Sequence, residues 1–226
     1  MSSVCIWTDH DRRINDFARR AFRDIADMDY IAARLAIRAS LFPQFLWSSL
    51  QAFEKYFKYI LLVNRIPSKK LGHDITAAIT KVREHVGYVE DMRADQLDVF
   101  KQIAEYGQDR YLIGSYAVDG VLLPQLDQAI WDARRYCQII LPPHGSPAED
   151  EAVSLKTLES IKRSREAPQK FKIHGGLLEE IISAKHHPSH SGLCWQNIFL
   201  AGELVDLFSR MITHMRQMHH CISIQK

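Results

Sequence analysis

Apolar residues recur along this chain at intervals of three and four positions, the spacing that places side chains on one face of an α-helix. The clearest run joins Leu46, Leu50, Phe53, Phe57 and Ile60. Charged side chains stand between them, as they do on the solvent face of an amphipathic helix. No segment shows the sustained alternation of β-branched and polar residues that is typical of a strand. The pattern therefore predicts an all-α protein.

Turn-forming residues and prolines divide this pattern into successive helices. A helix is predicted at residues 30–41, following acidic residues that suit the positive end of a helix dipole. Pro43 either kinks this helix or sits in the first turn of the next one. After a turn at residues 65–68, Asp74 is suited to cap a helix N-terminus. Further helices are expected at residues 74–85, 91–106, 122–141, 146–163, 176–186 and 193–221.

The predicted helices suggest a bundle with segments on either side of it. We expect an antiparallel, up-and-down helical bundle over residues 30–141. An N-terminal segment, 1–29, precedes the bundle, and a C-terminal helical extension, 142–226, follows it. The boundary before the extension is predicted from the Pro- and Gly-containing stretch 142–147. The loop at 107–120 carries aromatic and aliphatic groups, so we expect it to lie against the bundle.

Composition adds the class of protein to this picture. The chain has 226 residues, of which 46% are hydrophobic and 25% charged, as in soluble globular proteins. No apolar run approaches the roughly 20 residues that cross a bilayer, and the N-terminus lacks the apolar core of a secretory signal. The four cysteines form no CxxC pair, which favours reduced thiols. These features predict a cytoplasmic protein that does not associate with membranes.

Charge is informative only where it clusters. The formal net charge of +2 is too small to indicate a nucleic-acid partner by itself. Residues 156–172, KTLESIKRSREAPQKFK, nevertheless contain six basic and two acidic side chains. Such a cluster is typical of a face that contacts phosphates. It is equally typical of a solvated helix end followed by a loop, and both interpretations stay open.

Four short motifs resemble the HEPN family. Residues 51–62, QAFEKYFKYILL, are similar to the second-helix signature of HEPN domains. The family continues with a turn and a helix led by His-Asp, and residues 72–75, GHDI, match that element at the right distance. Asp109-Arg110-Tyr111 and Ala133-Arg134 also resemble the family pattern, so the resemblance covers about residues 30–141.

The resemblance implies a compact antiparallel bundle that commonly dimerises. HEPN members include RNA-cleaving toxins or defence nucleases, partners of small nucleotidyltransferases, and domains thought to bind nucleotides or other polyanions. The nuclease branch uses an Arg and a His separated by four to six residues. Here Arg65 and His73 have seven residues between them, while Arg210 and His214, like Arg216 and His220, have three. The expected spacing is absent, so no catalytic residue is assigned.

Candidate ligand-binding residues gather around the turn that leads to His73. A helix N-terminus favours anions through its free amides and its dipole, and nearby Lys and Arg side chains would add positive charge. Alternatively, His73 hydrogen-bonds a neighbouring helix or loop and locks the turn, and Arg110 pairs with a carboxylate such as Glu54. The candidate ligand-binding residues are Lys58, Lys69, Lys70, His73, Asp74, Arg110 and Tyr111.

The histidines near the C-terminus raise the question of a metal site. Imidazoles three or four residues apart on a helix can chelate zinc. Pro188 breaks this geometry between His187 and His190, and no acidic or Cys ligand stands at a suitable spacing. We therefore expect neither a metal nor a cofactor.

The sequence predicts a HEPN-like homodimer that binds a nucleotide, RNA or another polyanionic ligand. The alternative from the enzyme class is a HEPN ribonuclease or toxin component of a toxin–antitoxin or defence pair, with a nucleotidyltransferase or antitoxin as partner. A third reading is a structural interaction module whose helical faces mediate assembly.

Overall fold

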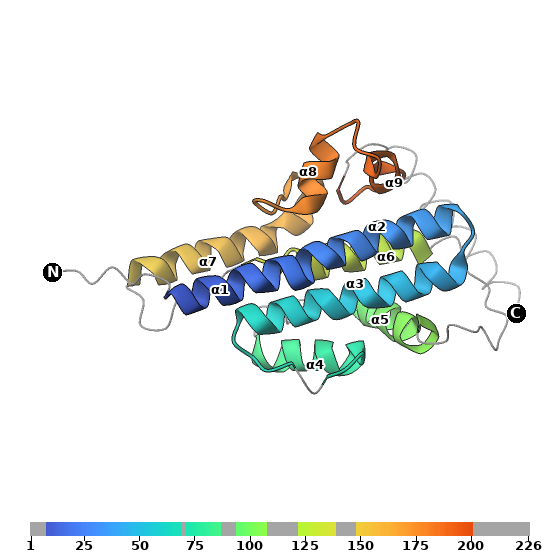
Figure 1. The fold of residues 1–226 in the computed structure, drawn as a ribbon. Coiled ribbons are helices and arrows are strands. Elements are labelled where there is room, and N and C mark those ends of the chain that lie inside the picture. Colours follow the sequence, from blue (N-terminus) through green and yellow to red (C-terminus); the bar gives the residue numbers. More distant parts are fainter. Residues whose placement is uncertain (1–7, 69–70, 87–93, 108–121, 139–147, 201–226) are drawn as a thin grey trace, which may run out of the picture.

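The computed structural model describes residues 8–68, 71–86, 94–107, 122–138 and 148–200. Within these ranges every regular element is a helix, as Figure 1 shows. The prediction of an all-α bundle is therefore confirmed. Among the described helices, none combines the length and apolarity that crossing a membrane requires.

The chain begins with one long helical rod. It consists of α1 (Asp9–Ala18), a π-helical turn (Arg19–Arg23) and α2 (Asp24–Arg38), which follow one another without a break. The predicted start of the first helix at residue 30 is wrong, because the helix begins at Asp9. The division that sets residues 1–29 apart as an N-terminal segment stays a prediction. The rod starts early because the Thr8 side chain caps its first amides, accepting from Asp11 N at 3.1 Å. Its first turns are too polar for an apolar stripe to reveal them.

Helix α3 (Phe42–Val63) packs against the rod and runs antiparallel to it in Figure 1. Pro43 lies in the first turn of α3, so the second of the two readings of this proline is confirmed. The predicted apolar stripe is buried along its whole length, from Leu46 to Ile60. The rings of Phe53 and Phe57 both meet Phe100 edge-on, with centroids 4.4 and 5.4 Å apart.

Three further helices pack on α3. Helix α4 (Ile75–His85) begins one residue after Asp74, as predicted, and α5 spans Ala94–Gly107. Helix α6 (Leu122–Arg134) ends earlier than the predicted residue 141. Its continuation tightens into a turn, because Cys137 N bonds to the Arg134 carbonyl, three residues back, at 2.7 Å. The loop 107–120, expected to lie against the bundle, falls outside the described residues apart from Gly107.

The extension after residue 147 is helical, but its helices are shorter than predicted. It contains α7 (Ala148–Arg163), two 3-10 turns (Ser164–Glu166 and Pro168–Lys170), α8 (Leu177–Ser183) and α9 (His190–Cys194). The predicted helix 193–221 is wrong up to residue 200, because Gln196 has a φ of 54°, which interrupts a right-handed helix. Residues 201–221 lie outside the described ranges.

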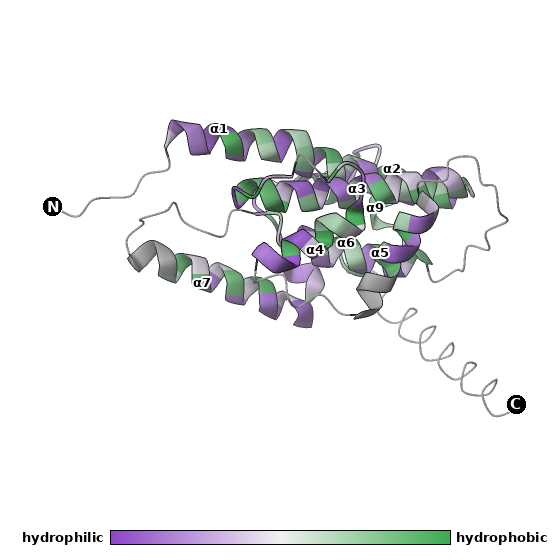
Figure 2. Cartoon of the chain, turned by 90° about the horizontal axis from the view of Figure 1, so that it is seen from below, coloured by the Kyte–Doolittle hydropathy of each residue, from purple (hydrophilic) through white to green (hydrophobic). Residues whose placement is uncertain are grey.

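The extension shares the core of the bundle. One cluster of buried apolar residues joins the α2–α3 pair to Ile161 of α7, Leu178 of α8 and Leu193 of α9. Figure 2 shows hydrophobic residues concentrated on the packed helices and a largely hydrophilic α1. In α7, by contrast, Val153 and Leu155 are exposed, so this helix is held mainly through its C-terminal end.

Candidate functional site

The turn between α3 and α4 is closed by internal contacts. Glu54 of α3 is almost completely buried. Its Oε1 accepts from Lys58 Nζ at 2.6 Å, and its Oε2 lies 2.7 Å from His73 Nδ1. Lys58 also donates to the Gly72 carbonyl at 2.8 Å. These contacts confirm the reading in which His73 bonds a neighbouring helix and locks the turn.

The remaining predicted ligand residues are only partly brought to this turn. Asp74 caps α4 by accepting from Ala77 N at 2.9 Å, which is a structural task. Lys69, Lys70, Arg110 and Tyr111 lie outside the described residues. Among the described candidates, the structure thus joins Lys58 and His73 around Glu54. Both are engaged by that carboxylate, so little uncompensated positive charge is left for a ligand.

A hollow beside the outer face of α4 offers no better cation cluster. It measures about 470 Å³. Its walls combine Lys81 and His85 with the carboxylates of Asp74 and Glu84. Because charges of both signs face the same space, an anionic ligand would meet repulsion as well as attraction there.

A second hollow, on the extension, is lined by the basic stretch singled out in the sequence. It has a volume of about 650 Å³ and lies between one face of α7 and the two 3-10 turns. We call it the basic hollow. Its lining residues are Gln138, Val153, Lys156, Thr157, Ser160, Arg163, Ser164, Ala167, Lys170, Phe171 and Lys172.

The basic hollow concentrates charge of one sign. Among the described residues that line it, four are cationic and none is a carboxylate. Lys156, Lys170 and Lys172 are exposed, and none of them forms an ion pair with another described residue. Arg163 pairs only loosely with Glu159, at 3.3 Å, and both side chains are more than 60% exposed. An exposed pair of this kind is weak and is readily exchanged for another anion.

The first wall of the basic hollow, the end of α7, is fixed to α6 by Arg135. This arginine is buried and donates to the Ile161 carbonyl at 2.9 Å. It also pairs with Asp132 at 2.9 Å, and the same carboxylate reaches Arg165 at 3.7 Å. One buried acidic group of α6 therefore holds the 3-10 turn that follows Arg163.

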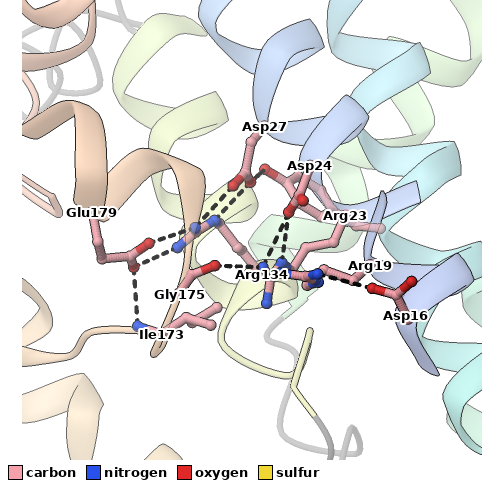
Figure 3. Close-up of polar contacts among 10 residues, drawn as sticks. Asp16, Arg19, Arg23, Asp24, Asp27, Arg134, Ile173, Gly175 and Glu179 are labelled. Carbon is pink, nitrogen blue, oxygen red and sulfur yellow. Dashed lines mark hydrogen bonds and ion pairs between the residues drawn. The ribbon is translucent and has the colours of Figure 1, made fainter. Parts of the chain in front are cut away.

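The second wall, around Lys172, is fixed by a buried network centred on Arg134, shown in Figure 3. Arg134 donates to both oxygens of Asp27, at 2.7 and 2.9 Å, and to both oxygens of Glu179, at 2.7 Å each. Glu179 in turn accepts from Ile173 N at 3.0 Å. The backbone one residue beyond Lys172 is thereby tied to the centre of the bundle.

The same network includes a second contact from the rod. Arg23 donates to the Gly175 carbonyl at 2.7 Å and pairs with Asp24 at 3.0 Å. On the far side of Asp27, the Tyr56 hydroxyl donates to its carboxylate at 2.6 Å. Burial and the neighbouring Asp27 raise the pKa of Tyr56 well above its ordinary range. Tyr56 thus stays protonated and remains a donor to Asp27.

Opposing effects set the pKa of Glu179. Burial acts to raise it, but hydrogen bonds and the charge of Arg134 outweigh burial and hold the pKa of Glu179 below its ordinary value of 4.5. Glu179 is therefore ionised at neutral pH. The network sets two arginines, Arg23 and Arg134, against three carboxylates, so it supports the hollow without offering a free cation to a ligand.

The sequence indicated the basic stretch but not the groups that hold it. Asp27 lies three and four residues before Tyr30 and Ile31, and Arg134 lies four residues after Ile130, so both occupy positions on apolar helix faces. A charged residue at a core position signals a buried partner. That signal does not reveal that Asp27 and Arg134 pair with each other. Nor does it point to Glu179, whose sequence position is typical of a surface residue.

Comparison with known proteins identifies no relative of this chain. The chain matches no model of a known protein family, and no curated protein or solved structure is significantly similar to it. Within the described ranges, no group of three or more His, Cys, Asp or Glu side chains is placed to hold a metal ion.

Proposed function

We propose that this protein is a HEPN-like helical protein that binds a polyanionic ligand, a nucleotide or RNA, in the basic hollow. One observation carries the proposal: the side chains that the structure describes around a single hollow include four cations and no carboxylate. Lys and Arg bind phosphates without reading sequence, and each neutralised phosphate releases counterions. The HEPN part of the proposal rests on the motifs at residues 51–62 and 72–75.

The basic hollow is a better candidate than the α3–α4 turn because its charges are available. At the turn, Lys58 and His73 share the carboxylate of Glu54. In the hollow, none of the described lining residues is a carboxylate. In Figure 1, α7 and α4 lie on opposite sides of α1 and α3, so the two places are separate sites.

The test is direct binding with a matched change of charge. Fluorescence anisotropy of a labelled 12-nucleotide RNA is measured with the full-length protein at low salt. Lys170→Glu/Lys172→Glu is compared with Arg83→Glu/Lys185→Glu, in which both original residues are exposed and neither lines the hollow. Both variants change the net charge by the same amount.

We expect the hollow variant to bind at least tenfold more weakly, and the control variant to stay within about threefold of the wild type. The slope of log affinity against log salt should fall by about 1.4 in the hollow variant, from two lost phosphate contacts on a single strand. Equal losses in the two variants, or no binding by the wild-type protein, would contradict the proposal.

A second candidate function is assembly through an exposed apolar stripe. Met28 and Leu35 of α2 are 52% and 43% exposed, and their spacing of seven residues places them on one face of this helix. Such a stripe is typical of an interface, which supports the expected homodimer or an interaction module. The mass in solution tests this: Met28→Glu/Leu35→Glu should dissociate a dimer, and a wild-type monomer at 100 μM would contradict it.

A further inference from the structure

The basic hollow is amphipathic as well as basic. Its cations are exposed, whereas Phe171 and Ala167, which also line it, are partly buried. Phe171 is the one aromatic residue among the lining residues, and it stands between Lys170 and Lys172 in the chain. The hollow therefore combines cations with an aromatic ring, the two elements that sequence-tolerant binding of single strands uses.

Phe171 is held in place by the protein interior. Its ring meets Trp131 at a centroid distance of 6.5 Å and an interplanar angle of 81°, an edge-to-face contact. Two residues later Ile173 is buried, and its amide is fixed by Glu179. A ring positioned in this way loses little conformational entropy when a flat group stacks on it.

The face of α7 that lines the hollow is long enough to follow a polymer. Val153, Lys156, Thr157, Ser160 and Arg163 are spaced at three and four residues, so they form one stripe. Lys156 and Arg163 are two helical turns apart, about 10 Å along the helix axis at 1.5 Å per residue. Cations with this separation favour a ligand that carries more than one phosphate. Hydroxyl groups lie between them and add hydrogen-bonding capacity.

From these features we infer that the ligand of the basic hollow is a single-stranded nucleic acid, with one base stacked on Phe171 and its phosphates along Lys156, Arg163, Lys170 and Lys172. This inference rests on the proposed function. A duplex keeps its bases stacked inside the helix and cannot offer one to Phe171. A polyphosphate chain would engage the cations but has no flat group to stack.

The experiment separates charge from stacking. Binding is measured for four labelled 12-mers: oligouridylate, oligothymidylate, an abasic strand of equal charge, and a blunt RNA duplex. Inorganic polyphosphate is tested as a competitor. Phe171→Leu retains apolar bulk but lacks the ring, and Phe171→Trp restores one. Circular dichroism confirms that each variant is folded, and Lys170→Glu/Lys172→Glu removes charge alone.

We expect a single strand to bind about tenfold more tightly than the abasic strand and the duplex, since one stacked base is worth about that factor. Phe171→Leu should abolish this preference without changing polyphosphate competition, and Phe171→Trp should preserve it. The tighter of oligouridylate and oligothymidylate identifies the sugar. Three results would overturn the inference but leave polyanion binding intact. They are equal binding of the base-containing and abasic strands, duplex binding as tight as that of a single strand, and a preference that survives Phe171→Leu. Failure of every probe to bind the wild-type protein overturns both.

Discussion

Arg134 provides the sharpest test of how the extension is joined to the bundle. Replacement of Arg134 by Met removes four charge-assisted hydrogen bonds, two to Asp27 and two to Glu179. Asp27 is completely buried and would retain the Tyr56 hydroxyl as a donor. Glu179 is 14% exposed and can recover some hydration.

The loss of stability depends on how deeply each of the two carboxylates is buried. Removing one partner of a buried ion pair costs about 3–5 kcal/mol, because the other charge stays buried without compensation. Asp27 meets that condition fully and Glu179 only in part. We therefore expect Arg134→Met to lower the free energy of unfolding by about 3–5 kcal/mol. Glu179→Gln keeps one acceptor oxygen for Arg134 and should cost less, about 1–3 kcal/mol.

The assay is urea unfolding followed by circular dichroism at 222 nm, with linear extrapolation to zero denaturant. Glu159→Gln is the matched control, because it breaks an exposed arginine pair on α7. That change should cost less than about 1 kcal/mol. A double-mutant cycle with Asp27→Leu completes the test, since the double variant no longer leaves the fully buried Asp27 charge without its arginine, while Glu179 has lost Arg134 in the single and the double variant alike.

The Asp27→Leu/Arg134→Met variant should be more stable than the sum of its two single changes implies, by about 2 kcal/mol or more. If Arg134→Met costs no more than Glu159→Gln, or if the two single changes simply add, then Arg134 does not neutralise Asp27 in the way described.

Three other outcomes are expected. Because Arg134 lowers the pKa of Glu179, this pair stabilises the protein above pH 4.5 and its contribution fades as the pH falls further, so Glu179→Gln should reduce the loss of Tm between neutral pH and pH 3. Gly176→Ala should cost about 1–3 kcal/mol in urea unfolding, because a Cβ there would meet Glu179 and stand 2.8 Å from Arg134 Nη2. Asp74→Ala should cost about 1 kcal/mol through loss of the cap on Ala77 N, whereas Asp74→Asn should be nearly neutral.

Features set by local spacing could be predicted from the sequence. The apolar stripe of α3 is buried as expected, and α4 begins one residue after its Asp74 cap. The basic stretch at residues 156–172 was also identified, because a cluster of like charges is visible without any tertiary contact. In each case the information lies within a few turns of one helix.

Features set by distant partners could not be predicted. Asp27 and Arg134 are 107 residues apart, and Arg134 and Glu179 are 45 apart. No local pattern assigns such partners, so the sequence did not predict the Arg134 network. The same reason explains why His73 was a candidate ligand residue: its partner, Glu54, lies on the preceding helix. The early start of the rod was missed for a different reason, because its polar first turns carry no apolar stripe.

Two neighbouring arginines, Arg134 at the end of α6 and Arg135 directly after it, connect the bundle to the basic hollow. Arg135 holds the end of α7, and Arg134 holds the segment after Lys172 through Glu179. The two walls belong to parts of the extension joined by short 3-10 turns, and α7 itself has little apolar contact with the bundle near Val153. Without these two anchors, the ligand would have to order the walls when it binds, and this entropic cost would weaken its affinity. The buried charges of α6 are thus best understood as the support that keeps an exposed, weakly packed helix in position for a ligand.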